Sequence, residues 1–305
     1  MDTFNQKNLY GLNIFFKHLK WLYDNKRLPN KILLSGQKGS GKFTLSLHLI
    51  NYILSEGEDY SYDVENLRIN EKNKSFILVK NNSSPNLYLI DAKKDKKSIE
   101  IDQIRDLINF CNKSSLNNKP RFILIDNLEV MNLNSNNALL RTLEEPNDNI
   151  YFILINNSQK ILPTIKSRCL NFKINLAQKE YISIFNKIVN QNINDLFNKD
   201  LISHYFTTGD LIHLYNFSID NKIDLSKISI KDLLLKVIDN NYYKNDILKI
   251  NLIYAFMQMY YLKNLKTNKN YDLYYKFIER IKNIRTFNLD IESLFIQFRH
   301  QLTNE

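Results

Sequence analysis

A glycine-rich loop between an apolar segment and a helical one constrains this fold more than any other part of the chain. The apolar segment 31–35 runs directly into Gly36-Gln-Lys-Gly-Ser-Gly-Lys42, and apolar residues then recur at positions 43, 47, 50 and 54. A strand, the pattern G-x-x-x-x-G-K and a helix in this order are the context in which a P-loop binds phosphate. Glycines let backbone N–H groups approach the phosphate oxygens, and the helix N-terminus and Lys42 add positive potential. The segment therefore predicts a phosphate-binding α/β unit.

Further apolar runs predict the other strands of a parallel sheet that is covered on both faces. These runs are Phe76–Val79, Leu87–Ile90, Phe122–Ile125, Tyr151–Ile155 and the alternating set Leu170, Phe172 and Ile174. Helical patterns lie over 8–27, 101–111 and 134–145, and the last ends at Pro146 because proline cannot continue a helix. The polar, aperiodic residues 56–75 predict a loop or insertion.

From about residue 175 the strand patterns end and helical periodicity takes over. Apolar residues recur at helical spacing near Tyr181, and again over 231–239, 247–263, 271–284 and 290–302. The sequence therefore predicts an α/β half followed by an all-helical half.

Charge and cysteine content restrict the class of protein. The net charge of +10 suits a polyanionic partner such as nucleic acid, but lysine-rich codon usage explains it equally well. The two cysteines, Cys111 and Cys169, are too few for a disulfide framework or a zinc site, and we expect small buried side chains. A signal-peptide pattern is absent from the sequence, and no apolar run approaches the roughly 18 residues of a membrane span. We expect a cytosolic protein without a membrane partner.

Two positions of the expected nucleotide site lack the side chains that hydrolysis needs. A Ser or Thr would follow Lys42 to bind Mg²⁺, but Phe43 stands there, and Thr44 is turned by about 100° around the helix. Asp126 ends an apolar strand where a metal-organising carboxylate would lie, yet the next residue, Asn127, cannot act as a general base. We expect no self-catalysed hydrolysis. A bound ATP or ADP and a loop that only shapes the fold both remain open.

Three further segments bear on the same site. Glu129 lies shortly after the strand end, and we expect it to face another direction. Asn156 or Asn157 is placed to orient water or a phosphate, and an ordinary loop asparagine is the equal alternative. The segment 209–213 contains no arginine where a lid would meet ATP, so a third catalytic element is missing.

Arg168 occupies a different kind of position. It follows Pro163–Ser167, a predicted short helical turn with proline at its start, and it immediately precedes the last strand. An arginine there can project from the surface, where its planar fork suits a partner's phosphate. Without further context such an arginine is more commonly solvated or ion-paired.

Together these segments resemble the delta-prime family of bacterial DNA polymerase III clamp-loader subunits, which belongs to the AAA+ proteins. The resemblance covers residues 10–175, and the run Leu-Leu-Arg-Thr-Leu-Glu-Glu-Pro with the later Ser-Arg-Cys is specific to clamp-loader ATPase-like subunits. The segments that carry it are Gly36–Lys42, Ser84–Asn86, Ile101–Arg105, Ile125-Asp126, Met131-Asn132, Asn137–Pro146 and Leu162–Cys169.

The resemblance implies a three-part plan and two kinds of site. It implies an AAA+ P-loop core with a parallel sheet over 1–174, a small helical lid over 175–220 and an all-helical collar for oligomerisation over 221–305. It implies that Arg168 acts in trans on ATP held by a neighbouring motor subunit. It also implies a degenerate nucleotide site made by Gly36, Gly39, Gly41, Lys42, Thr44 and Asp126.

The resemblance further implies the partners and the cofactors. The partners are motor ATPase subunits and delta in a hetero-oligomeric ring, with the sliding clamp and primed DNA reached through the complex. The chain would be an accessory subunit of a DNA-directed DNA polymerase without independent activity. Relatives often hold a four-cysteine zinc module after the P-loop helix, but residues 56–80 contain no cysteine, so we expect no zinc.

Two alternatives belong to other classes of function. One is an active P-loop ATPase, the motor subunit of the same loader, which a Ser or Thr after Lys42 and an acid at position 127 would favour. The other is a plain nucleic-acid-binding protein that uses its basic surface, with binding that falls steeply with salt. No base-reading helix or aromatic platform is recognisable for the second.

Overall fold

The computed structural model describes residues 6–92, 98–113, 117–144, 149–157, 160–244, 247–264, 268–287 and 289–303. Pro146, which was expected to end a helix, lies outside the described residues. The chain divides into two compact units. The first consists of Met1–Ile184 and Thr207–Gly209, and the second of Phe185–Phe206 and Asp210–Glu305.

A five-stranded parallel sheet forms the centre of the first unit. The strands are β1 (Lys31–Ser35), β2 (Leu87–Ile90), β3 (Arg121–Ile125), β4 (Ile150–Asn156) and β5 (Leu170–Lys173), in the order β2-β3-β4-β1-β5. All four pairings are parallel. The carboxyl ends of the strands therefore meet at one edge of the sheet, where Ser35 of β1 lies opposite Asn156 of β4.

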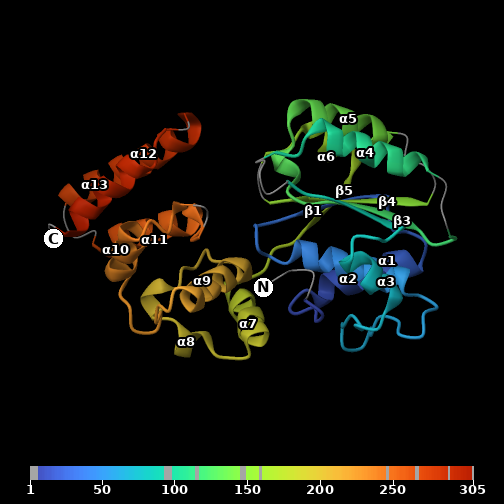
Figure 1. Ribbon diagram of the computed structural model, residues 1–305, viewed down its shortest axis with the longest axis horizontal. Coiled ribbons are helices and arrows are strands. Elements are labelled where there is room, and N and C mark those ends of the chain that lie inside the picture. The colour runs from blue at the N-terminus through green and yellow to red at the C-terminus, as the bar shows by residue number, and fades with distance from the viewer. Residues whose placement is uncertain are drawn as a thin grey trace. The chain divides into compact units, whose positions relative to one another are not determined.

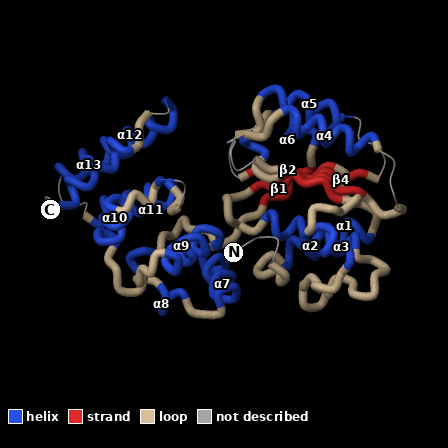
Figure 2. The backbone as a smooth tube through the Cα atoms, viewed as in Figure 1, coloured by secondary structure: helices blue, strands red, loops and turns tan. Residues whose placement is uncertain are grey.

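Helices cover both faces of this sheet (Figures 1 and 2). One layer holds α1 (Asn13–Asp24), α2 (Lys42–Leu54) and α3 (Lys74–Lys80); the other holds α4 (Ile101–Asn112), α5 (Leu133–Glu144) and α6 (Pro163–Arg168). Successive strand residues point to opposite faces. Phe122 and Leu124 of β3 pack in the first layer, while Ile123 and Ile125 pack in the second. This double burial is why the strand is apolar at every position.

The strand expected over Phe76–Val79 is wrong, because these residues belong to helix α3. The side chain of Asn73 caps the helix by accepting a hydrogen bond from the Phe76 backbone N–H at 2.8 Å. Phe76 is buried, whereas the next residue, Ile77, is 44% exposed. A short apolar run does not by itself distinguish a strand from a helix, and here the N-cap residue Asn73 marks the start of a helix.

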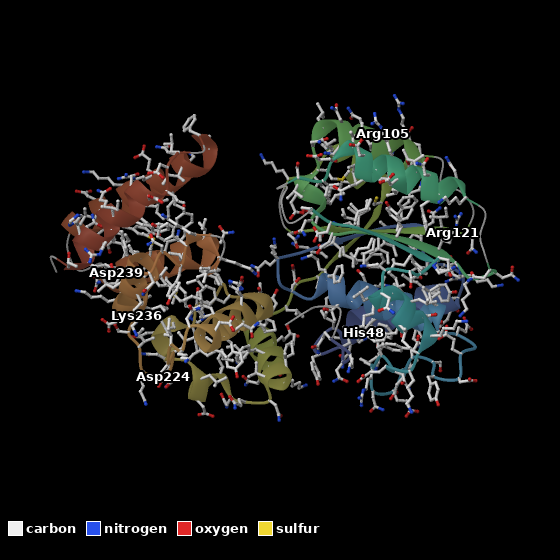
Figure 3. All side chains as sticks on the ribbon, in the orientation of Figure 1. His48, Arg105, Arg121, Asp224, Lys236 and Asp239 are labelled. Carbon is white, nitrogen blue, oxygen red and sulfur yellow. The ribbon has the colours of Figure 1, made fainter. Side chains whose placement is uncertain are left out.

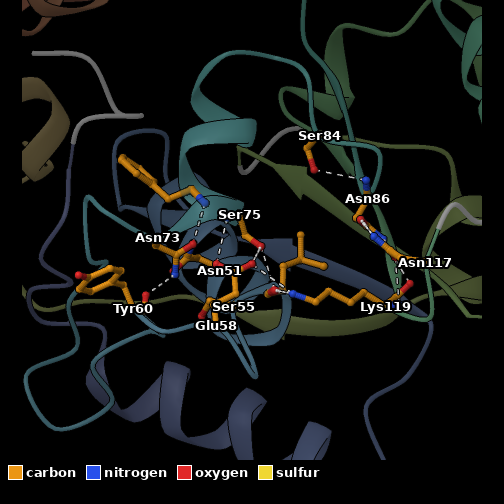
Figure 4. Close-up of polar contacts among 12 residues, drawn as sticks. Asn51, Ser55, Glu58, Tyr60, Asn73, Ser75, Ser84, Asn86, Asn117 and Lys119 are labelled. Carbon is orange, nitrogen blue, oxygen red and sulfur yellow. Dashed lines mark hydrogen bonds and ion pairs between the residues drawn. The ribbon is translucent and has the colours of Figure 1, made fainter.

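The predicted insertion after α2 contains no helix or strand between Ser55 and Asn73, and polar contacts fasten it to its surroundings (Figure 4). The Glu58 carboxylate accepts a hydrogen bond from the Ser75 hydroxyl at 2.5 Å and faces the Lys119 ammonium at 3.2 Å. The Asn73 side-chain amide donates to a backbone carbonyl of the insertion at 3.0 Å. Hydrogen bonds thus hold this segment in place.

Arg121, the first residue of β3, is a buried charge with a structural task (Figure 3). Its guanidinium donates to the carbonyls of Phe110, Cys111 and Lys113 at 3.0, 3.3 and 2.7 Å. The last carbonyls of a helix have no partners within the helix, so this side chain closes the end of α4.

The two cysteines differ slightly in exposure. Cys111 is buried and Cys169 is partly buried. Burial raises the pKa of both thiols to about 11. Both are therefore protonated at neutral pH, in agreement with the expectation of small packed side chains.

The remainder of the chain is helical, as predicted. The described residues after Lys173 contain no strand; their α-helices are α7 (Gln178–Val189), α8 (Ile193–Leu196), α9 (Thr208–Asp220), α10 (Ile230–Asp239), α11 (Ile250–Lys263), α12 (Asn268–Phe287) and α13 (Glu292–Thr303). Aromatic rings build much of the core of the second unit, for example Phe298 against Tyr261 and Phe277. The division into lid and collar near residue 220 stays a prediction.

The helices in the described part of the chain are too short or too polar to span a membrane.

Candidate functional site

The P-loop predicted from the sequence lies between β1 and α2. Gly39 and Gly41 have φ values of 82° and 86°, a left-handed backbone that favours glycine. Gly41 stands at the N-cap of α2, and no side chain caps this helix end. The first backbone N–H groups of α2 are thus directed at the position where a P-loop receives a phosphate.

The Lys42 ammonium is directed into the loop itself. It donates to the carbonyl oxygens of Gly36 and Gln37 at 2.8 and 2.6 Å and contacts the Ser40 hydroxyl at 3.3 Å. Lys42 is only 3% exposed, and burial lowers its pKa to about 8. A phosphate that bound here would have to compete with these three oxygens for the ammonium.

The start of α9 lies directly against the loop. The Gly209 backbone N–H donates to the Gly39 carbonyl at 3.0 Å. A Cβ added at Gly209 would lie 2.6 Å from the Gly39 Cα, a distance that real Cβ atoms do not reach. Both positions therefore require glycine, and the sequence alone indicated this requirement only for the loop.

Asp126 directly follows β3 at the same edge of the sheet, as expected. Burial and the neighbouring Asp91 carboxylate raise the pKa of Asp126 to about 6. The nearby Lys42 ammonium lowers the pKa of Asp126, but by less than burial raises it. Lys42 and Asp126 are consequently both charged between about pH 6 and pH 8.

Asn127 joins the ends of three neighbouring strands. Its side-chain N–H₂ donates to Asp91 Oδ1 at 2.7 Å, and its Oδ1 accepts from the Asn157 side chain at 2.9 Å.

The Glu129 carboxylate accepts a hydrogen bond from the Asn157 backbone N–H at 3.1 Å, so the expectation that Glu129 faces another direction is wrong. Asp91 was missed in the sequence, although an acid directly after an apolar strand is the same signal that identified Asp126.

The donors at the loop fit a phosphate group better than they fit a magnesium-bound nucleotide. Lys42 and the uncapped start of α2 supply the positive potential for a phosphate. The position after Lys42 holds Phe43, which packs partly buried against the hydrophobic core, and Thr44 lies half-buried on the next position of the helix. A bound ATP or ADP would be held by the backbone of Gly36–Lys42 and by Lys42.

Arg168 lies at the other edge of the sheet. It ends α6 just before β5, whose first residue, Leu170, pairs with Ile32 near the start of β1. The P-loop begins four residues beyond Ile32, about 13 Å further along the strand. The structure therefore brings Gly36–Lys42 and Asp126 together and places Arg168 apart from them.

Two oxygen atoms hold the Arg168 guanidinium. Its Nη1 donates to the Thr164 carbonyl at 2.9 Å, and its Nη2 forms an ion pair with Glu144 Oε1 at 2.6 Å. Both side chains are partly exposed, at 34% for Arg168 and 51% for Glu144. Sequence reasoning included Glu144 in a motif but gave it no role.

Comparison with known proteins gives a consistent family. Residues 11–178 match the family described as "DNA polymerase III, delta subunit". Over 87 residues the chain is 37% identical to DNA polymerase III subunit delta' of Pseudomonas aeruginosa, which covers 28% of this chain and 26% of the relative. Over 228 residues it is 29% identical to DNA polymerase III subunit gamma of Buchnera aphidicola subsp. Schizaphis graminum, covering 73% of this chain and 60% of the relative.

The matched regions span less than two thirds of the length of these two relatives. Among solved structures, a DNA polymerase III gamma subunit-related protein of Thermotoga maritima superposes with a TM-score of 0.51 and 16% identity. That match covers 93% of this chain and 99% of the other. At this identity the likeness concerns the fold.

Proposed function

The chain belongs to the delta-prime family of DNA polymerase III subunits, with an α/β AAA+ core and a helical C-terminal part, and we propose that it is a clamp-loader subunit without ATP hydrolysis of its own. It donates Arg168 to the ATP of a neighbouring motor subunit in a hetero-oligomeric cytoplasmic ring that also contains delta. The ring loads the sliding clamp on primed DNA. In this proposal residues 175–220 act as the lid and 221–305 as the collar.

The position of Arg168 carries this proposal. The arginine lies at the amino edge of the sheet, whereas the P-loop of the same chain lies at the carboxyl edge. An arginine side chain does not reach across that separation, so Arg168 can assist phosphoryl transfer only at a site that another subunit supplies. Arginine fingers act in this way by stabilising negative charge on the transferred group.

The chain's own P-loop also supports the proposal that this subunit does not hydrolyse ATP itself. At the two departures from a hydrolytic site, Phe43 packs against the core and Asn127 is hydrogen-bonded to Asp91 and Asn157. The contact between Gly209 and Gly39 further restricts the loop. These features favour a vestigial or purely structural nucleotide site.

Substitution of Arg168 tests the proposal in the reconstituted complex. We expect Arg168→Ala to leave folding and assembly intact and to lower turnover at the dependent ATP site on the order of 10³-fold. The measurement is phosphate release by the complex together with clamp loading. Arg105→Ala is a matched control, because Arg105 is also an exposed arginine of the α/β unit (Figure 3). It forms an ion pair with Asp102 on the same helix, α4. Unchanged turnover in Arg168→Ala would refute the finger.

A motor ATPase remains the second candidate, because the similarity to a gamma subunit extends over 73% of this chain. This candidate requires that the isolated chain hydrolyse ATP with Mg²⁺ and that Lys42→Ala abolish the activity. A nucleotide titration with and without Mg²⁺ separates the two readings. Under our proposal, hydrolysis is absent and any nucleotide binding is independent of the metal.

A further inference from the structure

Arg168 is held by two contacts of different kinds. The bond from Nη1 to the Thr164 carbonyl lies within α6 and joins residues four apart, so it orients the guanidinium against its own helix turn. The ion pair of Nη2 with Glu144 joins residues 24 apart, on α6 and α5. One side of the guanidinium is therefore bonded to the backbone of its own helix, while the other is paired with a half-exposed carboxylate.

The carboxylate of Glu144 has the same chemistry as the ligand expected for Arg168. A guanidinium fork binds carboxylate and phosphate oxygens with similar geometry. Glu144 is about half exposed, and the attraction within an exposed ion pair is weak and screened by salt. A phosphate carries more negative charge and more acceptor oxygens than a carboxylate, so it can replace Glu144 at Nη2 while Thr164 keeps Nη1 in place.

We propose that Glu144 is a positioning residue that competes with the partner's γ-phosphate for Arg168. This inference rests on the proposed function, since it requires Arg168 to act in trans. Without ATP in the partner, the guanidinium stays paired with Glu144 and oriented by Thr164. With ATP in the partner, Nη2 exchanges the Glu144 carboxylate for a phosphate oxygen. Glu144 thereby reduces the apparent affinity of the neighbouring site for ATP.

The test uses Glu144→Gln in the reconstituted complex. Removal of the negative charge weakens the competition, so we expect the ATP concentration for half-maximal turnover to fall by about two- to fivefold. The maximal rate should change little, because the finger itself is intact. The effect should shrink as salt is raised, and it should vanish when Arg168→Ala is also present, because Glu144 acts through Arg168.

Glu71→Gln serves as the matched control, because Glu71 is similarly exposed and pairs with Lys7 in the same unit. A purely structural role of Glu144 would change the stability of the variant but not its salt-dependent competition with ATP. If Arg168→Ala lowers turnover and Glu144→Gln behaves as wild type, the competition is refuted and the finger stands. A Glu144→Gln variant that loses turnover would also overturn the competition. If Arg168→Ala has no effect, the proposed function itself fails.

Discussion

At Asn127 an amide stands where a hydrolytic site needs a carboxylate, and both the N–H₂ and the oxygen of that amide form hydrogen bonds. The side chain donates to Asp91 and accepts from Asn157, and the backbone has a left-handed φ of 53°. Asparagine tolerates this conformation better than most residues. The residue type alone predicted the loss of a general base, but the backbone conformation and both partners depend on neighbouring strands and were not readable from the sequence.

Asn127→Glu should destabilise the fold and should not create hydrolysis. Glutamate cannot donate to Asp91, and its charge would lie close to Asp91 and to Asp126, whose pKa is already raised by burial and by Asp91. The lost hydrogen bond and the left-handed backbone together predict a loss of about 2–4 kcal/mol in the free energy of unfolding, measured with denaturant.

Asn82→Glu provides the comparison for this variant. Asn82 has nearly the same φ, 52°, and its side chain is exposed. Its substitution therefore measures the backbone cost alone, about 1 kcal/mol. If Asn127→Glu costs no more than Asn82→Glu, the polar contacts of Asn127 contribute nothing to stability.

The apolar runs of the sequence correctly predict the strands of the sheet, but the run at Phe76–Val79 forms helix α3 instead of a strand. The strands β1, β3 and β4 are continuous apolar runs because both of their faces are covered, and this pattern is visible in the sequence. The run at Phe76 has the same composition but lies on a helix that Asn73 caps. The order of the strands, and with it the separation of Arg168 from the P-loop, is set by pairing between distant residues and has no local signal.

Gly209, at the start of α9, contacts Gly39 of the P-loop, and its substitution tests this contact. In Gly209→Ala the new Cβ meets backbone atoms of Gly39, which cannot rotate away as a side chain would. We expect a net loss of about 1–2 kcal/mol in unfolding free energy, although alanine is otherwise the better helix residue. Gly57→Ala is a comparison for backbone strain without a clash: a Cβ at Gly57 meets nothing within 4 Å, but its left-handed φ of 76° alone predicts a cost of about 1 kcal/mol. A Gly209→Ala variant as stable as wild type would show that the backbone of Gly39 can move away from the new Cβ.

Two titratable groups, the buried His48 and the partly buried Asp126, give the stability of the folded protein opposite dependences on pH. His48 is fully buried in the helical layer that contains α2 (Figure 3), with its ring nitrogens bonded to the Tyr62 hydroxyl and the Gln6 carbonyl. Burial lowers the pKa of His48 to about 4, so the folded state favours the neutral ring. Burial and Asp91 raise the pKa of Asp126 to about 6, so the folded state favours the neutral acid.

These shifts act in opposite directions between about pH 4 and pH 6. The contribution of His48 is complete above its ordinary pKa near 6.5 and is lost as pH falls to about 4, a change of about 3 kcal/mol. Asp126 instead loses a similar, about 3 kcal/mol contribution as pH rises from its ordinary value to about 6. We therefore expect His48→Gln to gain stability relative to wild type as pH is lowered, and Asp126→Asn to gain it as pH is raised. Urea unfolding of the three proteins at pH 4, 5, 6 and 7 measures both differences. Background carboxylates cancel in each difference, so parallel curves for all three proteins would contradict both pKa shifts.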